Sequence, residues 1–318
     1  MRRVFGLLKL FNLQIPISQI ESDLSRYLKK DVKIEGIQVD IARETSGSRL
    51  AIATISTPKK YVFLVKESTE HELNILHIVN KVVGKFVPRV LRWDKGESVF
   101  IWLENVPGWL NPFLFKVAET LIDVIFEYHS YTIFNYKEVG ETFSLQPPDK
   151  GYITSVCDKA LEALYRDQII EKSDLDCIKK RLGDTLNAFK QATFPLVLAH
   201  GYFVPSVIRA EGDRVVFYDW NCSSLTYPQI DLVLLMDRII TISNYQRYPC
   251  DTDFLLHRYL RELDDLGVKG DFYSIYNTCY FFKILPLLRH WSLCKPVDER
   301  VEAEVKSKIA TMKRLEVI

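Results

Sequence analysis

The spacing of apolar residues changes several times along the chain, and each change predicts a different element. Between residues 16 and 30 the apolar positions recur every three or four residues, at Ile17, Ile20, Leu24 and Leu28. This is the period of an amphipathic helix, and Ser18 is a candidate cap for its first turn. The segment before it, residues 1–15, has a basic start and an apolar run. We expect that segment to pack on the fold, with contact to a membrane surface as the alternative.

The next part of the chain has the short apolar runs of an antiparallel sheet. Two runs between Val32 and Ile55 are separated by the small polar cluster 44–48, which is typical of a hairpin turn. A third run covers residues 61–66, and a helical period follows over residues 69–83. Two further runs within residues 90–103 predict a closing hairpin. The first hundred residues therefore predict strands around a single helix.

Beyond Pro107 and Gly108 the period is mainly helical, with one strand-rich island at residues 195–219. The predicted helices cover residues 112–130, 151–168, 172–191, 230–244, 252–265, 272–290 and 298–318. No internal repeat and no low-complexity linker interrupts this order. The pattern indicates an α+β protein whose strands and helices are segregated along the chain.

Composition narrows the class of protein. The chain has 318 residues, with 42 basic and 41 acidic side chains, so its charge does not indicate a nucleic-acid partner. Its six cysteines lack CxxC spacing, which disfavours a zinc site and a secreted disulfide framework. No stretch reaches the length of about 18 apolar residues that a membrane-spanning helix needs. We expect a cytoplasmic protein with reduced thiols.

The strand-rich island carries the most specific motif. It reads LVLAHGYFVPSVIRAEGDRVVFYDWNCSSLTYPQIDLVLLM. The segment resembles the catalytic segment of aminoglycoside phosphotransferases, choline kinases and homoserine kinase-like proteins, whose pattern is HGDxxPxN, a hairpin, DW or DF, and PxxDLA. The matching positions are His200, Gly201, Pro205, Asp219, Trp220, Pro228, Asp231 and Leu232.

The amino-terminal part adds matches in the order in which that family has them. Lys66 ends a hydrophobic strand, and Glu72 lies six residues later in HELNIL, so the resemblance implies a lysine–glutamate pair against the nucleotide phosphates. The segment WLENVPG resembles the hinge, which implies backbone contacts to adenine from Trp102, Glu104 and Val106. The turn Ser46, Gly47 and Ser48 resembles the nucleotide loop, although one glycine makes a poor phosphate cradle.

The resemblance covers residues of about 35–290 and implies a bilobal protein-kinase-like fold. Residues 1–31 would form an amino-terminal helical segment, and residues 32–108 a small antiparallel-sheet lobe with one helix that binds nucleotide. Residues 109–318 would form a larger, mainly helical lobe, with the catalytic-loop-like segment at 196–232. The implied cofactors are ATP or GTP with Mg²⁺.

The catalytic loop departs from the family pattern at two positions. Tyr202 stands where the family has the aspartate that orients the acceptor hydroxyl, and Val207 stands where it has a magnesium-binding asparagine. A tyrosine hydroxyl is protonated at neutral pH and is a poor base, and a valine side chain cannot bind a metal. Asp219 alone keeps the implied metal-ligating role, while the resemblance assigns His200 and Asp231 to scaffolding.

Simpler interpretations of these residues stand beside the functional ones. A lysine after an apolar strand is commonly a solvated end, a glutamate early in a helix commonly interacts with the helix dipole, and His200 can be a structural histidine. Two kinase-like functions remain open, beside a third in which the cleft holds another ligand or the protein acts on a partner surface. One is a degenerate, pseudokinase-type protein that binds nucleotide and magnesium and serves as a binding or scaffolding partner for a small molecule or protein. The other is an active phosphotransferase that acts on a hydroxyl with a non-standard loop.

Overall fold

The structure is a computed structural model. It describes residues 7–10, 13–42, 49–96, 98–108, 115–134, 148–189, 193–203, 207–212, 214–246, 251–293 and 299–315. Contacts divide the chain into two compact units, of which the first is Met1–Leu110 with Ser206–Asn221 and the second is Asn111–Pro205 with Cys222–Ile318. The segment Ser206–Asn221, which the sequence analysis assigns to the helical lobe, thus belongs with the first unit.

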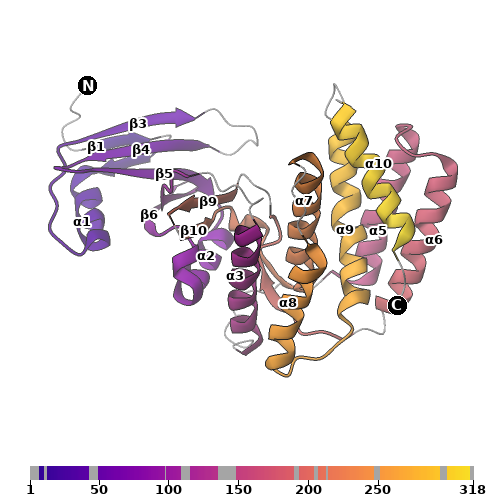
Figure 1. Cartoon of the computed structure of the whole chain (residues 1–318). Coiled ribbons are helices and arrows are strands. Elements are labelled where there is room, and N and C mark those ends of the chain that lie inside the picture. The colour runs from indigo at the N-terminus through magenta and orange to yellow at the C-terminus, as the bar shows by residue number, and fades with distance from the viewer. Residues whose placement is uncertain are drawn as a thin grey trace. The chain divides into compact units, whose positions relative to one another are not determined.

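A five-stranded antiparallel sheet forms the centre of the first unit, as the apolar runs predict (Figure 1). Its strands are β3 (Gly36–Ala42), β4 (Leu50–Ser56), β5 (Lys60–Ser68), β6 (Val90–Lys95) and β7 (Val99–Glu104). Their order is β3-β4-β5-β7-β6, so β5 lies in the middle of the sheet. The register pairs Lys66 with Leu50 on one side and with Ile101 on the other. This central position gives Lys66 a fixed place on the sheet.

One face of this sheet is covered by the amino-terminal segment. The helix α1 (Ile17–Leu28) occupies the predicted place, but it begins after Pro16 without a side-chain cap, so the proposed cap at Ser18 is wrong. Residues before it form a hairpin of β1 (Leu7–Leu10) and β2 (Leu13–Pro16), which the helical interpretation of residues 1–31 missed. The shared core contains Leu10, Ile15, Ile20, Leu24, Ala51, Ala53, Ile55, Phe63, Val65, Leu91, Phe100 and Trp102.

The helix α2 (Glu70–Val83) supplies the partner of Lys66 on the opposite face of the sheet. Side chains alternate along a strand, so the burial of Val65 in the α1 core turns its neighbour Lys66 to the opposite side. There Lys66 meets Glu72 in the first turn of α2. The hydroxyl of Thr69 caps this helix by accepting a hydrogen bond from the Glu72 amide. The cap fixes the start of the helix and with it the position of Glu72.

A short hairpin completes the first unit, formed by β9 (Ile208–Glu211) and β10 (Arg214–Phe217). The amide of Ala210 donates to the Gly108 carbonyl at 3.0 Å. A side chain at position 108 would collide with the backbone of Ala210, because a Cβ there would lie 1.7 Å from its carbonyl oxygen. The glycine therefore permits the close approach that joins this hairpin to the end of the β7 segment.

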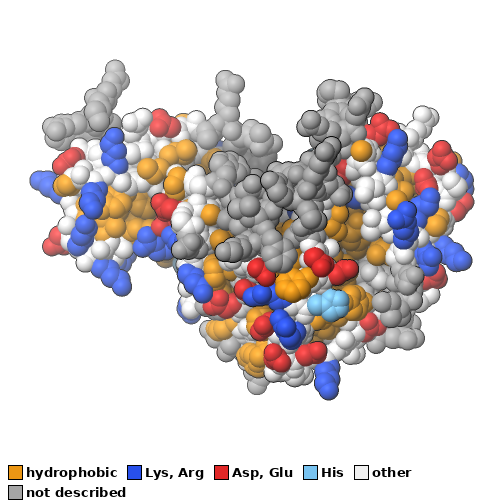
Figure 2. Space-filling model, viewed as in Figure 1, with side chains coloured by type: hydrophobic (Ala, Val, Ile, Leu, Met, Phe, Trp, Pro, Cys, Tyr) orange, Lys and Arg blue, Asp and Glu red, His pale blue; other side chains and the backbone are white. Residues whose placement is uncertain are grey.

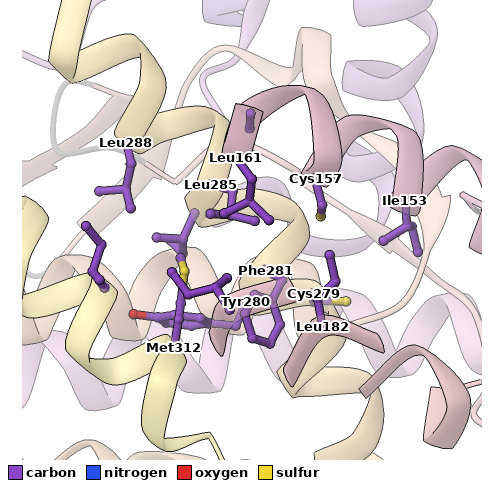
Figure 3. Close-up of a cluster of buried hydrophobic side chains, with 14 of the residues drawn as sticks. Ile153, Cys157, Leu161, Leu182, Cys279, Tyr280, Phe281, Leu285, Leu288 and Met312 are labelled. Atoms are coloured by element: carbon purple, nitrogen blue, oxygen red, sulfur yellow. The ribbon is translucent and has the colours of Figure 1, made fainter. Parts of the chain in front are cut away.

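The second unit is built mainly from helices. They are α3 (Phe115–Phe134), α5 (Lys150–Arg166), α6 (Lys172–Phe189), α7 (Gln229–Gln246), α8 (Thr252–Asp265), α9 (Phe272–Leu293) and α10 (Glu299–Arg314). A short antiparallel pair, β8 (Val197–Ala199) and β11 (Ser224–Thr226), lies among them. The helix α9 packs against α5, α6, α7 and α10. Figure 3 shows the resulting core, where Leu161, Phe281 and Met312 gather from three of these helices.

Surface features of the described residues agree with the balanced charge. Figure 2 shows Lys and Arg side chains interspersed with Asp and Glu over the visible face. Among the described helices, none combines the length and hydropathy needed to cross a membrane.

The packing of α1 against the sheet yields a stability prediction. Leu24 is fully buried in this core, so Leu24→Ala leaves a cavity and lowers the free energy of unfolding by about 2–5 kcal/mol. Urea denaturation measures the loss. Ser22→Ala on the exposed side of the same helix is the control and should change stability by less than about 0.5 kcal/mol. Equal stability of Leu24→Ala and wild type would show that α1 does not support the sheet.

Candidate functional site

A buried lysine with two carboxylate partners forms the centre of the candidate site. The Nζ atom of Lys66 lies 3.1 Å from each carboxylate oxygen of Glu72 and 2.6 Å from Oδ1 of Asp219. Burial disfavours the charged amine, but the carboxylates of Glu72 and Asp219 outweigh it and raise the pKa of Lys66. The three residues that sequence reasoning singled out from separate motifs thus meet in the first unit.

Glu72 holds this cluster to the rest of the unit. Its side chain is 1% exposed and also accepts a hydrogen bond from the Trp220 amide at 3.0 Å. The hydroxyl of Ser68 donates to the same carboxylate. Burial of a polar group costs free energy unless hydrogen-bond partners of this kind replace the lost water. Glu72 therefore links β5, α2 and the chain after β10, which is a structural role as well as an electrostatic one.

Asp219 presents the accessible oxygen atoms of the cluster. Its side chain is 39% exposed, whereas that of Lys66 is 15% exposed. The backbone of Asp219 has a φ of 63°, a left-handed conformation that is uncommon for residues other than glycine. The side-chain amide of Asn221 donates to Oδ1 of Asp219 at 3.4 Å, and the Thr69 hydroxyl donates to Oδ1 of Asn221 at 3.0 Å. These contacts hold the carboxylate toward Lys66.

The segment that follows β7 is the expected adenine-binding hinge. Its backbone groups already have partners within the first unit. The hydroxyl of Tyr218 donates to the Glu104 carbonyl at 2.6 Å and accepts from the Val106 amide at 3.0 Å. The Glu104 amide donates to the Arg89 carbonyl at 2.9 Å, and the Asn105 amide donates to the Val62 carbonyl at 3.2 Å. Sequence reasoning did not include Tyr218, although it stands next to Asp219.

The side chain of Glu104 is an ion-pair partner within the first unit. Arg89 and Arg214 each approach its carboxylate to 2.9 Å. Burial alone would raise the pKa of Glu104, but hydrogen bonds from Arg214 and Arg89 lower it to about 2. Arg214 also donates to the backbone carbonyls of Lys85 and Val87. This network, which sequence reasoning missed, ties β10 to the end of β7.

Two further expectations for the nucleotide site concern Trp102 and the phosphate loop. The side chain of Trp102 lies in the α1 core, because strand alternation turns it to the face opposite Lys66. It is fully buried, and its indole nitrogen has no hydrogen-bond partner among the described residues. The side chain is therefore part of the core, and the backbone contact from Trp102 to a nucleotide stays a prediction. The proposed phosphate loop, Ser46, Gly47 and Ser48, lies outside the described residues.

In the second unit, Asp231 organises the catalytic-loop-like segment. Its fully buried carboxylate accepts hydrogen bonds from the amides of His200 and Gly201, each at 2.7 Å. The hydroxyl of Tyr128 donates to it, and the ring of His129 lies 3.2 Å away. Burial would raise the pKa of Asp231, but His129 and these donors lower it. The geometry fits the scaffolding role expected for Asp231.

Tyr128 and His129 had no signal in the sequence beyond a helical period. Both lie on α3, while Asp231 lies at the start of α7, about a hundred residues later. The buried His129 contacts the Tyr259 hydroxyl at 2.7 Å, and burial lowers its pKa. Only the fold brings these groups together. Together with Asp231, Tyr128 and His129 form a buried polar cluster next to the backbone of His200 and Gly201.

The two substituted loop positions offer no ligating group. The side chain of Tyr202 is 40% exposed, and its backbone amide donates to the His200 ring at 3.3 Å. Val207 is buried, and its carbonyl accepts from the Tyr218 amide. Within the described residues, no group of three or more His, Cys, Asp or Glu side chains could hold a metal ion. Asp219 is therefore the candidate for a single protein ligand to a metal that phosphates and waters would complete.

The Glu104 ion pairs predict a pH-dependent contribution to stability. Because the folded-state pKa is below the ordinary value of 4.5, this contribution is present above pH 4.5 and is lost as pH falls toward about 2. Glu104→Gln should lower the free energy of unfolding by about 1–2 kcal/mol at pH 7, since the half-exposed Arg89 is screened by solvent.

Denaturant unfolding at several pH values measures this effect. The deficit of Glu104→Gln relative to wild type should shrink between pH 4.5 and 2. Glu35→Gln, at an exposed position of the same unit, should show no comparable deficit. A deficit that stays constant with pH would contradict the ion-pair explanation.

Comparisons with known proteins report on the fold. No protein-family model matches the sequence, and no curated protein matches it. Among solved structures, a choline kinase from Cryptosporidium parvum Iowa II matches with a TM-score of 0.57 and 14% identity, covering 93% of this chain and 94% of that one. Spectinomycin phosphotransferase, solved with ADP and spectinomycin, matches with a TM-score of 0.55 and 12% identity, covering 92% and 97%.

A third match is a choline/ethanolamine kinase family protein from Mesorhizobium loti. Its TM-score is 0.54 at 15% identity, and the match covers 94% of each chain. These likenesses extend over nearly the whole chain and include the five-stranded antiparallel sheet and the helical part. The chain therefore has the bilobal protein-kinase-like fold of the aminoglycoside phosphotransferases and choline kinases.

Proposed function

We propose that this protein is a pseudokinase-type relative of the phosphotransferases, which binds a phosphorylated ligand at Lys66 and acts as a binding or scaffolding partner. The observation that supports it is the cluster of Lys66, Glu72 and Asp219 in a chain whose catalytic-loop-like segment has Tyr202 and Val207 at the usual catalytic positions. Phosphoryl transfer depends on positioning, on neutralised phosphate charge and on an oriented acceptor hydroxyl. The cluster serves the first two needs, and the loop does not serve the third.

The positive end of the site is suited to phosphate. The amine of Lys66 is held by two carboxylates and stays protonated, since its pKa is raised. A phosphate oxygen could replace Asp219, the more exposed partner, while Glu72 remains buried behind the lysine. Such an exchange trades one charged acceptor for another. Binding would free the Asp219 carboxylate for other contacts.

The two substituted positions of the catalytic-loop-like segment do not supply the groups that transfer needs. Tyr202 carries a phenol where the family has a carboxylate base, and removal of a positioned base typically slows a reaction by about 10²–10⁴-fold. Val207 adds no oxygen ligand, so Asp219 would be the one remaining ligand of the two that the resemblance implies. When bound, Mg²⁺ would neutralise phosphate charge.

ATP or GTP with Mg²⁺ is the ligand that the sequence resemblance implies. Spectinomycin phosphotransferase was solved with ADP, and so was an aminoglycoside phosphotransferase with the same fold. Those nucleotides belong to those proteins. For this chain the supporting observation is the cluster around Lys66.

An activity measurement tests the absence of transfer. Purified protein is incubated with ATP, Mg²⁺ and a panel of hydroxyl acceptors that includes choline, ethanolamine, spectinomycin and a serine peptide, and ADP release is recorded. We expect wild type to release no more ADP than Lys66→Ala. Lys60→Ala, an exposed lysine of the same strand, is the control for altered charge. ADP release that falls at least tenfold in Lys66→Ala alone would establish the active phosphotransferase instead.

Phosphate binding is tested separately with inorganic tripolyphosphate, which has no base. Calorimetry should detect binding to wild type and to Lys60→Ala, and binding should weaken at least tenfold in Lys66→Ala because the buried amine is lost. Circular dichroism confirms that each variant is folded. Equal affinity of wild type and Lys66→Ala would contradict the proposed ligand site.

A further inference from the structure

The hydroxyl of Tyr218 occupies two backbone groups of the hinge segment. It donates to the Glu104 carbonyl at 2.6 Å and accepts from the Val106 amide at 3.0 Å. The Tyr218 side chain is 8% exposed, so these hydrogen bonds are shielded from water. A phenol can donate one hydrogen bond and accept others at the same oxygen atom. Tyr218 thus satisfies both backbone groups with one atom.

The two groups form a recognition pair. A carbonyl at one residue and an amide two residues later present an acceptor and a donor to the same ligand edge, provided that the segment between them is extended. The edge of an adenine ring offers the complementary pair, an amino donor beside a ring-nitrogen acceptor. The Asn105 amide between them is turned away and donates to the Val62 carbonyl. In this structure the complementary partner is the chain's own Tyr218.

Several contacts hold the tyrosine in this place. Its amide donates to the Val207 carbonyl at 2.8 Å, which extends the pairing of β9 and β10 by one residue. The next residue, Asp219, is bound to Lys66 at 2.6 Å. Arg214, on the strand β10 that precedes Tyr218, is bound to the Glu104 carboxylate. Displacement of Tyr218 would therefore disturb its backbone on both sides.

We propose that Tyr218 fills the base-recognition position of the first unit, so that the site binds phosphate without a purine. The ligand class is a phosphorylated or polyphosphate compound that lacks a nucleobase. The phosphate part of this statement rests on the proposed function of Lys66, whereas the occupation of the hinge by Tyr218 does not. The expected nucleotide contacts at Glu104 and Val106 are thereby replaced by an internal contact.

Calorimetry with three probes separates the two ends of the site. Tripolyphosphate reports on the Lys66 end, adenosine on the hinge, and ATP with Mg²⁺ on both. For wild type we expect no adenosine binding, and ATP affinity within threefold of tripolyphosphate affinity. Tyr218→Ala frees the Glu104 carbonyl and the Val106 amide, so adenosine binding should appear and ATP should bind at least tenfold more tightly than tripolyphosphate.

The control is Tyr61→Ala, which removes a half-buried tyrosine from β5 of the same unit and should leave the wild-type pattern unchanged. Adenosine binding to wild type, or its absence from folded Tyr218→Ala, overturns the inference. If wild type does not bind tripolyphosphate but Tyr218→Ala binds adenosine, the phosphate role of Lys66 is refuted. The inference that Tyr218 occupies the hinge then still stands.

A second variant tests the hydrogen bonds without opening a cavity. Tyr218→Phe keeps the ring but removes the oxygen atom, so the Val106 amide loses its acceptor. Hydrogen exchange of the Val106 amide, followed by nuclear magnetic resonance, should be at least tenfold faster in Tyr218→Phe than in wild type. Adenosine should still be excluded by the ring. Unchanged exchange at Val106 would show that the hydroxyl does not hold the hinge.

Discussion

The attraction between one buried ammonium group and two carboxylates organises the first unit. Lys66 comes from the central strand β5, Glu72 from the first turn of α2, and Asp219 from the chain after β10. None of these charges could be buried alone at moderate cost, because an unpaired ion in a protein interior loses its hydration. Their pairing therefore fixes three separate segments at once. The hinge network of Glu104, Arg89 and Arg214 extends the same principle to the edge of the sheet.

In the second unit, a single buried carboxylate holds several polar groups together. Asp231 gathers two backbone amides, a tyrosine hydroxyl and a histidine, which gives the loop around His200 a defined backbone path without any charged side chain at Tyr202. A scaffold of this kind keeps the loop ordered whether or not it performs chemistry. The retention of a loop conformation is thus separable from the retention of catalytic groups.

Sequence reasoning found the elements because their periods are strong, and it found Lys66, Glu72 and Asp219 because their motifs are spaced as in a known family. It missed the β1–β2 hairpin, whose strands have four residues each and show little alternation. It also missed Arg214 on β10 and Tyr218 just after it, since the local sequence around an arginine or a tyrosine has no signature of its partner. Such contacts depend on which segments the fold brings together, and a linear pattern does not contain that information.

Burial of Trp102 also gives the first unit an optical property. Its indole lies in an apolar core without a hydrogen-bond partner among the described residues, whereas the equally buried indole of Trp220 donates to the Phe217 carbonyl at 3.0 Å. Indole emission shifts to shorter wavelength in apolar surroundings and to longer wavelength when its nitrogen is hydrogen-bonded. The two rings have different surroundings, because Trp102 belongs to the core with α1 whereas the Trp220 backbone amide donates to Glu72. Fluorescence from Trp102 would therefore report on the integrity of the sheet, and fluorescence from Trp220 on events at the ion cluster.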